Sequence, residues 1–65
     1  MPADPLVHQR LASTYHLLGR LDEAITHYRA AIRHGGTRSA YANLGTILYR
    51  QGQFAEAVAS YDESL

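Results

Sequence analysis

Four histidines are the residues of this 65-residue chain with the widest chemical range, because neutral imidazole is the commonest protein ligand for transition metals. His8 and His16 are eight residues apart, and His27 and His34 are seven apart. On one helix these spacings amount to roughly 10 to 12 Å, which is too far for two rings to hold one ion. We therefore expect no metal and no cofactor, and we interpret the histidines as residues of the surface or of helix packing.

Catalytic carboxylates are the second possibility, and they would have to converge on one point. Asp22 is adjacent to Glu23, and Asp62 is adjacent to Glu63, but neighbours on a helix point about 100° apart. No serine lies in a nucleophile motif, and Gly35-Gly36 is too short for a phosphate-binding loop. The sequence contains no catalytic signal, so we predict that the chain is not an enzyme.

The composition is that of an ordinary soluble globular protein. The chain has no cysteine, an apolar fraction of 46%, and six basic against six acidic residues. A balanced charge gives no net attraction to phosphate backbones or anionic lipid. No apolar run approaches the roughly 18 residues that a membrane span needs. We expect neither nucleic acid nor a membrane as partner, and the cytoplasm as the location.

The elements that must position these residues occur twice along the chain. Laying residues 5–32 over residues 38–65 gives five identities among 28 pairs. The identical pairs are Leu11/Leu44, Gly19/Gly52, Glu23/Glu56, Ala24/Ala57 and Tyr28/Tyr61. A repeat with this offset indicates an architecture in which each unit is one small supersecondary element.

Apolar residues recur at helical spacing within each unit. We predict helices over about 5–18, 22–34 and 38–51, and a fourth from 54 onward. Inward positions should include Leu11, Ala12, Tyr15, Leu18, Ala24, Ile25, Tyr28, Ala31 and Ile32 in the first unit, and Leu44, Gly45, Leu48, Ala57, Val58 and Tyr61 in the second. The predicted fold class is all-α, with two helix–turn–helix units that form a short α-solenoid.

Helix boundaries are predicted from capping residues. Asp4 before Pro5 should begin the first helix, since the carboxylate can accept from free N–H groups of the first turn. Asp22 and Glu23 favour the start of the second helix through its dipole. Either Thr37 or Ser39 is expected to cap the third helix, and Gly19, Gly35-Gly36 and Gly52 should end helices in left-handed conformations.

The two units resemble the tetratricopeptide repeat, which couples W-x2-L-G-x2-Y on one helix to A-x3-F on the next. Tyr41, Leu44, Gly45, Leu48, Ala57 and Tyr61 carry the match in the second unit, and Leu11, Ala12, Tyr15, Ala24 and Tyr28 carry it in the first. The resemblance divides the chain into a lead-in at 1–4, a first repeat at 5–37, and a second at 38–65 that ends without a capping helix. It implies a non-enzymatic protein–protein interaction module. The second repeat is similar to those of O-linked N-acetylglucosamine transferase.

The resemblance also implies a groove lined by the first helix of each unit. The family's groove positions are occupied by Gln9, Arg10, Ser13 and His16, and by Ser39, Asn43, Thr46, Tyr49 and Arg50. Asn43 matches an asparagine that holds peptide backbone in the transferase-like repeats, and an amide can bond both N–H and C=O groups of an extended chain. We predict that this groove binds an extended peptide or a partner helix. The clamp that grips chaperone tails needs Lys at Gln9 and Asn at Ser13, so that partner is not expected.

An apolar stripe of Val58, Tyr61 and Leu65 remains on the last predicted helix. In a solenoid the next unit or a polar-faced capping helix covers such a stripe, and three repeats are the usual minimum for stability. The alternative function is therefore self-association, either as a fragment of a longer natural or engineered array, or as a homo-oligomer in which two copies cover each other's ends with twofold symmetry. A third possibility is a segment of a larger enzyme whose catalytic domain lies elsewhere, as in some glycosyltransferases and sulfotransferases.

Overall fold

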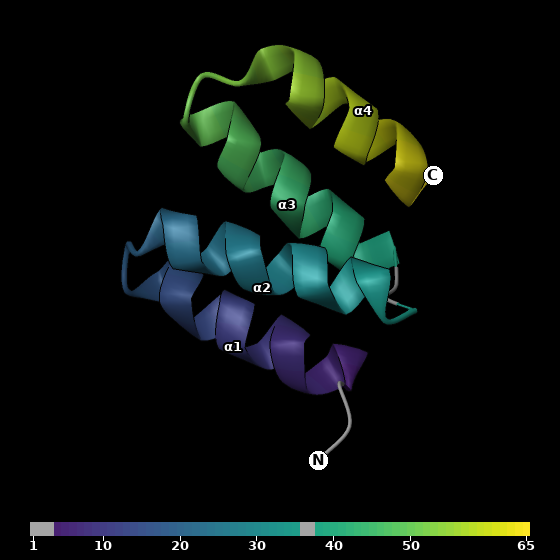
Figure 1. Cartoon of the computed structure of the whole chain (residues 1–65). Coiled ribbons are helices and arrows are strands. Elements are labelled where there is room, and N and C mark those ends of the chain that lie inside the picture. The colour runs from purple at the N-terminus through teal and green to yellow at the C-terminus, as the bar shows by residue number, and fades with distance from the viewer. Residues whose placement is uncertain (1–3, 36–37) are drawn as a thin grey trace.

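The computed structural model describes residues 4–35 and 38–65. These residues form four helices, α1 (Pro5–Leu17), α2 (Leu21–Arg33), α3 (Arg38–Arg50) and α4 (Phe54–Ser64). The helices lie side by side in chain order, so α1 and α4 are at opposite edges of the molecule (Figure 1). Packing joins α1 to α2, α2 to α3 and α3 to α4. The all-α prediction of two helix pairs is confirmed, and the predicted helix ends differ from the observed ones by about one residue.

The first helix begins where its capping residue predicts. Asp4 has an extended backbone, and its carboxylate accepts a hydrogen bond from the Leu6 N–H at 2.9 Å. Pro5 occupies the first helical position, where its missing N–H costs nothing. This cap satisfies one of the otherwise unpaired N–H groups of the first turn and contributes about 1 kcal/mol.

The turns within the two units end α1 and α3 in the same way. Gly19 has a φ of +79° and Gly52 a φ of +80°, in the left-handed region that L residues avoid. The Arg20 N–H then donates to the carbonyl of Tyr15 at 2.9 Å, and the Gln53 N–H donates to that of Leu48 at 2.9 Å. These bonds satisfy helix-end carbonyls in a Schellman motif. The predicted glycine stops at positions 19, 35 and 52 are confirmed, while Gly36 lies outside the described residues.

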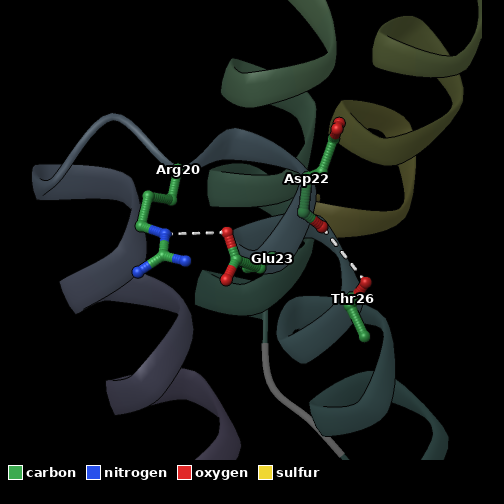
Figure 2. Close-up of polar contacts among 4 residues, drawn as sticks. All are labelled: Arg20, Asp22, Glu23 and Thr26. Carbon is green, nitrogen blue, oxygen red and sulfur yellow. Dashed lines mark hydrogen bonds and ion pairs between the residues drawn. The ribbon is translucent and has the colours of Figure 1, made fainter.

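The second helix starts without a side-chain cap. Asp22 and Glu23 both lie in its first turn, as predicted, where negative charge complements the helix dipole. Figure 2 shows the Glu23 carboxylate paired with Arg20 Nε at 2.9 Å, and the Thr26 hydroxyl donating to the Asp22 carbonyl at 3.1 Å. The turn between α1 and α2 is therefore tied to the helix that follows it.

The prediction that Ser39 caps the third helix is wrong. Helix α3 begins at Arg38, so Ser39 is already inside the helix and cannot hold the flanking conformation that a capping residue needs. The other candidate, Thr37, lies outside the described residues.

Small residues lie where the helices cross. The fully or almost fully buried alanines are Ala12, Ala24, Ala31, Ala40 and Ala57, and the largest buried side chains are Tyr28, Ile47 and Leu48. Alanine allows two helix backbones to approach closely, while the larger side chains fill the space beside the crossing. Four residues predicted to face inward, Leu11, Leu18, Val58 and Tyr61, are exposed instead, since they lie on the outer helices α1 and α4 or, for Leu18, directly after α1.

Candidate interaction surfaces

The predicted groove residues of the second unit all lie on α3. Ser39 is in its first turn, and the other four form the surface that we call the α3 strip, namely Asn43, Thr46, Tyr49 and Arg50. Thr46 and Arg50 follow Asn43 at spacings of three and seven residues, so these three side chains share one face of the helix. A different face of α3 carries Ala40, Leu44 and Leu48 and is buried. The fold therefore presents the α3 strip away from the core.

Within the α3 strip, two polar side chains are available to a ligand. Neither the Asn43 amide nor the Arg50 guanidinium has a hydrogen-bond or ion-pair partner among residues 4–35 and 38–65. Arg50 is exposed and Asn43 is half-buried. A half-buried amide with unused donors and acceptor is a favourable anchor for a peptide backbone.

The other two members of the α3 strip have partners in the fold. The Thr46 hydroxyl donates to the Ala42 carbonyl at 3.1 Å and lies 2.9 Å from the Tyr61 hydroxyl. Because the single Thr46 proton is directed at Ala42, the Tyr61 hydroxyl is the donor to Thr46. Tyr49 is exposed, and its ring meets that of Phe54 edge-on at 5.3 Å between centroids. These contacts orient the strip and attach it to α4.

The first helix carries the other predicted groove residues, Gln9, Arg10, Ser13 and His16, which we call the α1 strip. Gln9, Ser13 and His16 recur at spacings of four and three residues and so share one face of α1. Arg10 and Ser13 are exposed, whereas Gln9 and His16 are half-buried. Helix α2 lies between α1 and α3 in the view of Figure 1, so the two strips belong to separate helix pairs.

Three histidines meet between α1 and α2. The Nδ1 atoms of His8 and His27 are 3.1 Å apart, and the His8 and His34 ring centroids are 6.0 Å apart. Tyr15 stacks on His27 at 5.5 Å between centroids. This cluster agrees with the packing interpretation of the histidines, but comparing spacings within single helices does not reveal it. The signal that sequence reasoning needed is the packing of α1 on α2, which brings His8 to His27.

The histidine contact is a hydrogen bond between two rings. The two Nδ1 atoms are closer than the ring centroids, which are 5.4 Å apart, and the ring planes differ by only 25°, so the rings meet through these nitrogens. One imidazole must donate and the other must be neutral to accept. Among the residues that the structure describes, no group of three or more His, Asp or Glu side chains is arranged to hold a metal ion.

The outer face of α4 is apolar and exposed. It contains Val58, Tyr61 and Leu65, which we call the α4 face. The Tyr61 ring is partly engaged, since a Cβ added to Gly45 would lie 3.1 Å from two of its carbons. Val58 and Leu65 are more exposed still. The predicted apolar stripe is therefore present on the folded helix.

The outer side of α1 carries a shallow hollow of about 380 Å³. It is lined by Val7, Arg10, Leu11 and Thr14, and we call it the α1 hollow. Val7, Leu11 and Thr14 recur at spacings of four and three residues, which places them on one face. Sequence reasoning missed this surface because it assigned Leu11 to the core.

Comparison with known proteins identifies the repeat. The family model of the tetratricopeptide repeat matches residues 4–65. No curated protein and no solved structure matches the chain, so the similarity of the second unit to the transferase repeats gains no support. Over residues 4–35 and 38–65, no helix is long and apolar enough to cross a membrane. With two helix pairs of related sequence and a match over almost its whole length, the chain belongs to the tetratricopeptide repeat family.

Proposed function

We propose that the chain binds an extended, acidic peptide of a partner protein along the α3 strip. Repeats of this family generally act as protein–protein interaction modules. The observation that carries the proposal is the pair of unused polar side chains, Asn43 and Arg50, seven residues apart on one face of α3. At about 1.5 Å per residue they are separated by roughly 10 Å along the helix, which is about the length of three extended residues.

The two side chains suit different parts of a peptide. The Asn43 amide can donate to a backbone carbonyl and accept from a backbone N–H, as in the asparagine-based mode expected from the transferase-like repeats. The Arg50 guanidinium suits a carboxylate, which it can bind with two parallel hydrogen bonds. Tyr49 adds an exposed ring beside Arg50. The proposed ligand thus has a backbone segment at Asn43 and an acidic side chain at Arg50.

Charge supports an acidic ligand. The α1 and α3 strips together contain Arg10 and Arg50, and they contain no carboxylate. The molecule as a whole has no net charge, so the absence of acidic groups from both strips makes these surfaces locally positive. A basic peptide would lack a partner for its charges on this surface.

The adjacent carboxylates of the first unit, Asp22 and Glu23, have structural partners within the fold, which favours a binding function over a catalytic one. Asp22 accepts a hydrogen bond from Gln51 Nε2 at 3.2 Å, and Glu23 is paired with Arg20. Both side chains hold turns and helix starts together, and they do not converge on a common point. We infer that this chain binds its partner without transforming it.

A displayed library of random peptides, selected on the immobilised chain, tests the proposal. Selected sequences should be enriched in Asp and Glu, and their affinity, measured by fluorescence anisotropy, should fall at least about tenfold in the Asn43→Ala/Arg50→Ala double variant. Arg33→Ala is the matched control, because Arg33 is an exposed arginine of α2 outside both strips. Equal binding by the double variant, with its helix content intact, would remove the α3 strip as the binding site.

A further inference from the structure

We propose that copies of this chain associate head to tail, with the α4 face of one copy packed in the α1 hollow of the next. The packing of α2 on α3 within the chain provides the template. This inference goes beyond the proposed peptide site, since it uses the two outer edges of the molecule and leaves the α3 strip free.

A comparison of α2 with α4, the second helices of the two units, shows which side chains of α2 are covered by α3. Tyr28 of α2 is 1% exposed, whereas Tyr61, its equivalent on α4 in the second unit, is 39% exposed. Leu65 and Val58 are exposed, while the corresponding isoleucines of α2 are half-buried against the core. Helix α2 has α3 beside it and α4 has no following helix among the described residues. The α4 face thus repeats the surface with which α2 packs on α3.

A comparison of α1 with α3, the first helices of the two units, shows the surface on which a helix like α4 could pack. Ala40 and Leu44 of α3 are 0% and 5% exposed, whereas their equivalents on α1, Val7 and Leu11, are 52% and 41% exposed. Ile47 of α3 is buried and corresponds to the exposed Thr14. Val7, Leu11 and Thr14 are three of the four residues that line the α1 hollow. The hollow on α1 therefore occupies the position that, on α3, is in contact with α2.

Charge favours this pairing over a twofold pairing of two α4 faces. Helix α4 carries the acidic residues Asp62 and Glu63, which have no ion-pair partner among the described residues, and no basic residue, while its third acidic residue, Glu56, is paired with Arg29 of α2 at 3.2 Å. Helix α1 carries Arg10 and no acidic residue. Two α4 helices packed together would place like charges side by side, whereas α4 on α1 joins opposite charges. The twofold arrangement expected from the sequence would also leave the α1 hollow uncovered.

Head-to-tail contact has a distinctive consequence for size. Each copy presents one α4 face and one α1 hollow at opposite edges (Figure 1), so the association continues beyond a dimer. A single helix packed on a single helix buries little area, so we expect dissociation constants in roughly the micromolar to millimolar range. The average molar mass should rise steadily with concentration, without a plateau at the dimer.

Two charge substitutions test the pairing by complementation. Leu11→Asp blocks the α1 hollow and leaves the α4 face intact, whereas Val58→Asp does the opposite. Sedimentation equilibrium should find each variant monomeric alone, and an equimolar mixture should form a one-to-one dimer and nothing larger. Leu17→Asp is the matched control, because Leu17 is an exposed leucine of α1 outside the hollow, and this variant should associate like the parent chain.

The other outcomes decide against the proposal. A parent chain that is monomeric up to millimolar concentration overturns it, and so does a Leu11→Asp variant that still dimerises, which would indicate twofold pairing through α4. Circular dichroism monitors the fold, and if Leu11→Asp unfolds, Val7→Asp takes its place because Val7 is more exposed. Peptide binding is tested with substitutions of Asn43 and Arg50, which lie outside the α4 face and the α1 hollow. Failure of head-to-tail association and failure of peptide binding can therefore be told apart.

Discussion

The ring of Tyr61 lies directly over Gly45, close enough that a Cβ added to the glycine would be 3.1 Å from ring carbons Cδ1 and Cε1. The equivalent pair in the first unit is Tyr28 and Ala12, both of which are buried. The same packing position therefore accepts an alanine when the neighbouring tyrosine adjusts slightly. Glycine at position 45 allows the close contact with Tyr61, but the fold does not require it.

Gly45→Ala should leave the chain as stable as the parent or make it more stable by up to about 1 kcal/mol. Alanine lowers the cost of forming the helix interior by about that amount, and Tyr61 can shift outward because it is partly exposed. Urea unfolding followed by circular dichroism measures the change. Gly45→Leu should instead destabilise by roughly 1 to 3 kcal/mol through overpacking. A large loss in the alanine variant would show that Tyr61 is held rigidly.

The hydroxyl contact between Tyr61 and Thr46 should contribute a small coupling energy. The bond is 2.9 Å long but exposed, so Tyr61→Phe is expected to cost about 0.5 kcal/mol, at the low end for a hydrogen bond. A double-mutant cycle with Thr46→Ala isolates the coupling. Additive losses in the cycle would mean that the two hydroxyls bond to water rather than to each other.

Asp4→Ala should destabilise the chain by about 1 kcal/mol and loosen the first turn of α1, because the Leu6 N–H loses its acceptor. Amide hydrogen exchange at Leu6 and Val7 should accelerate more than exchange in α3. Asp4→Asn retains an acceptor oxygen and serves as the control, with most of the stability restored. Unchanged exchange in the alanine variant would argue against the cap.

The His8–His27 bond should show an asymmetry between single and double replacement. His27→Leu leaves the part-buried His8 Nδ1 without its partner, and we expect a loss of about 1 kcal/mol or more. Replacing both histidines with leucine removes the unpaired group and should recover much of that loss. Thermal unfolding at pH 8 measures both variants. A double variant with the sum of the two single losses would contradict a direct contact.

Much of the fold could be predicted from particular residues. Asp4, Gly19 and Gly52 mark helix ends through local conformation alone, so the sequence is enough to place them. The internal repeat of the sequence then determines which helices pair. Ser39 was misassigned because capping ability does not specify which residue begins the helix, and α3 starts one position earlier.

The surfaces were harder to predict, for a physical reason. The exposed stripe with Val58 was expected from the sequence. Helical periodicity also places Leu11 in an apolar stripe, but only the packed structure shows that no described helix covers that stripe. The His8–His27 contact depends on the register between two helices, which spacing within one helix does not contain. The binding roles of Asn43 and Arg50 stay predictions based on exposure and on the absence of internal partners among the described residues.

The packing of each helix mainly on its neighbours in the chain has a consequence for folding kinetics. Contacts between elements close in sequence need only short loops to close, so we expect folding in the microsecond to millisecond range. Helices α1 and α4 each pack mainly on one neighbour, whereas α2 and α3 each pack on two. Local opening should therefore start at the outer helices, and the slowest-exchanging amides should lie in α2 and α3, on either side of the junction between the repeats.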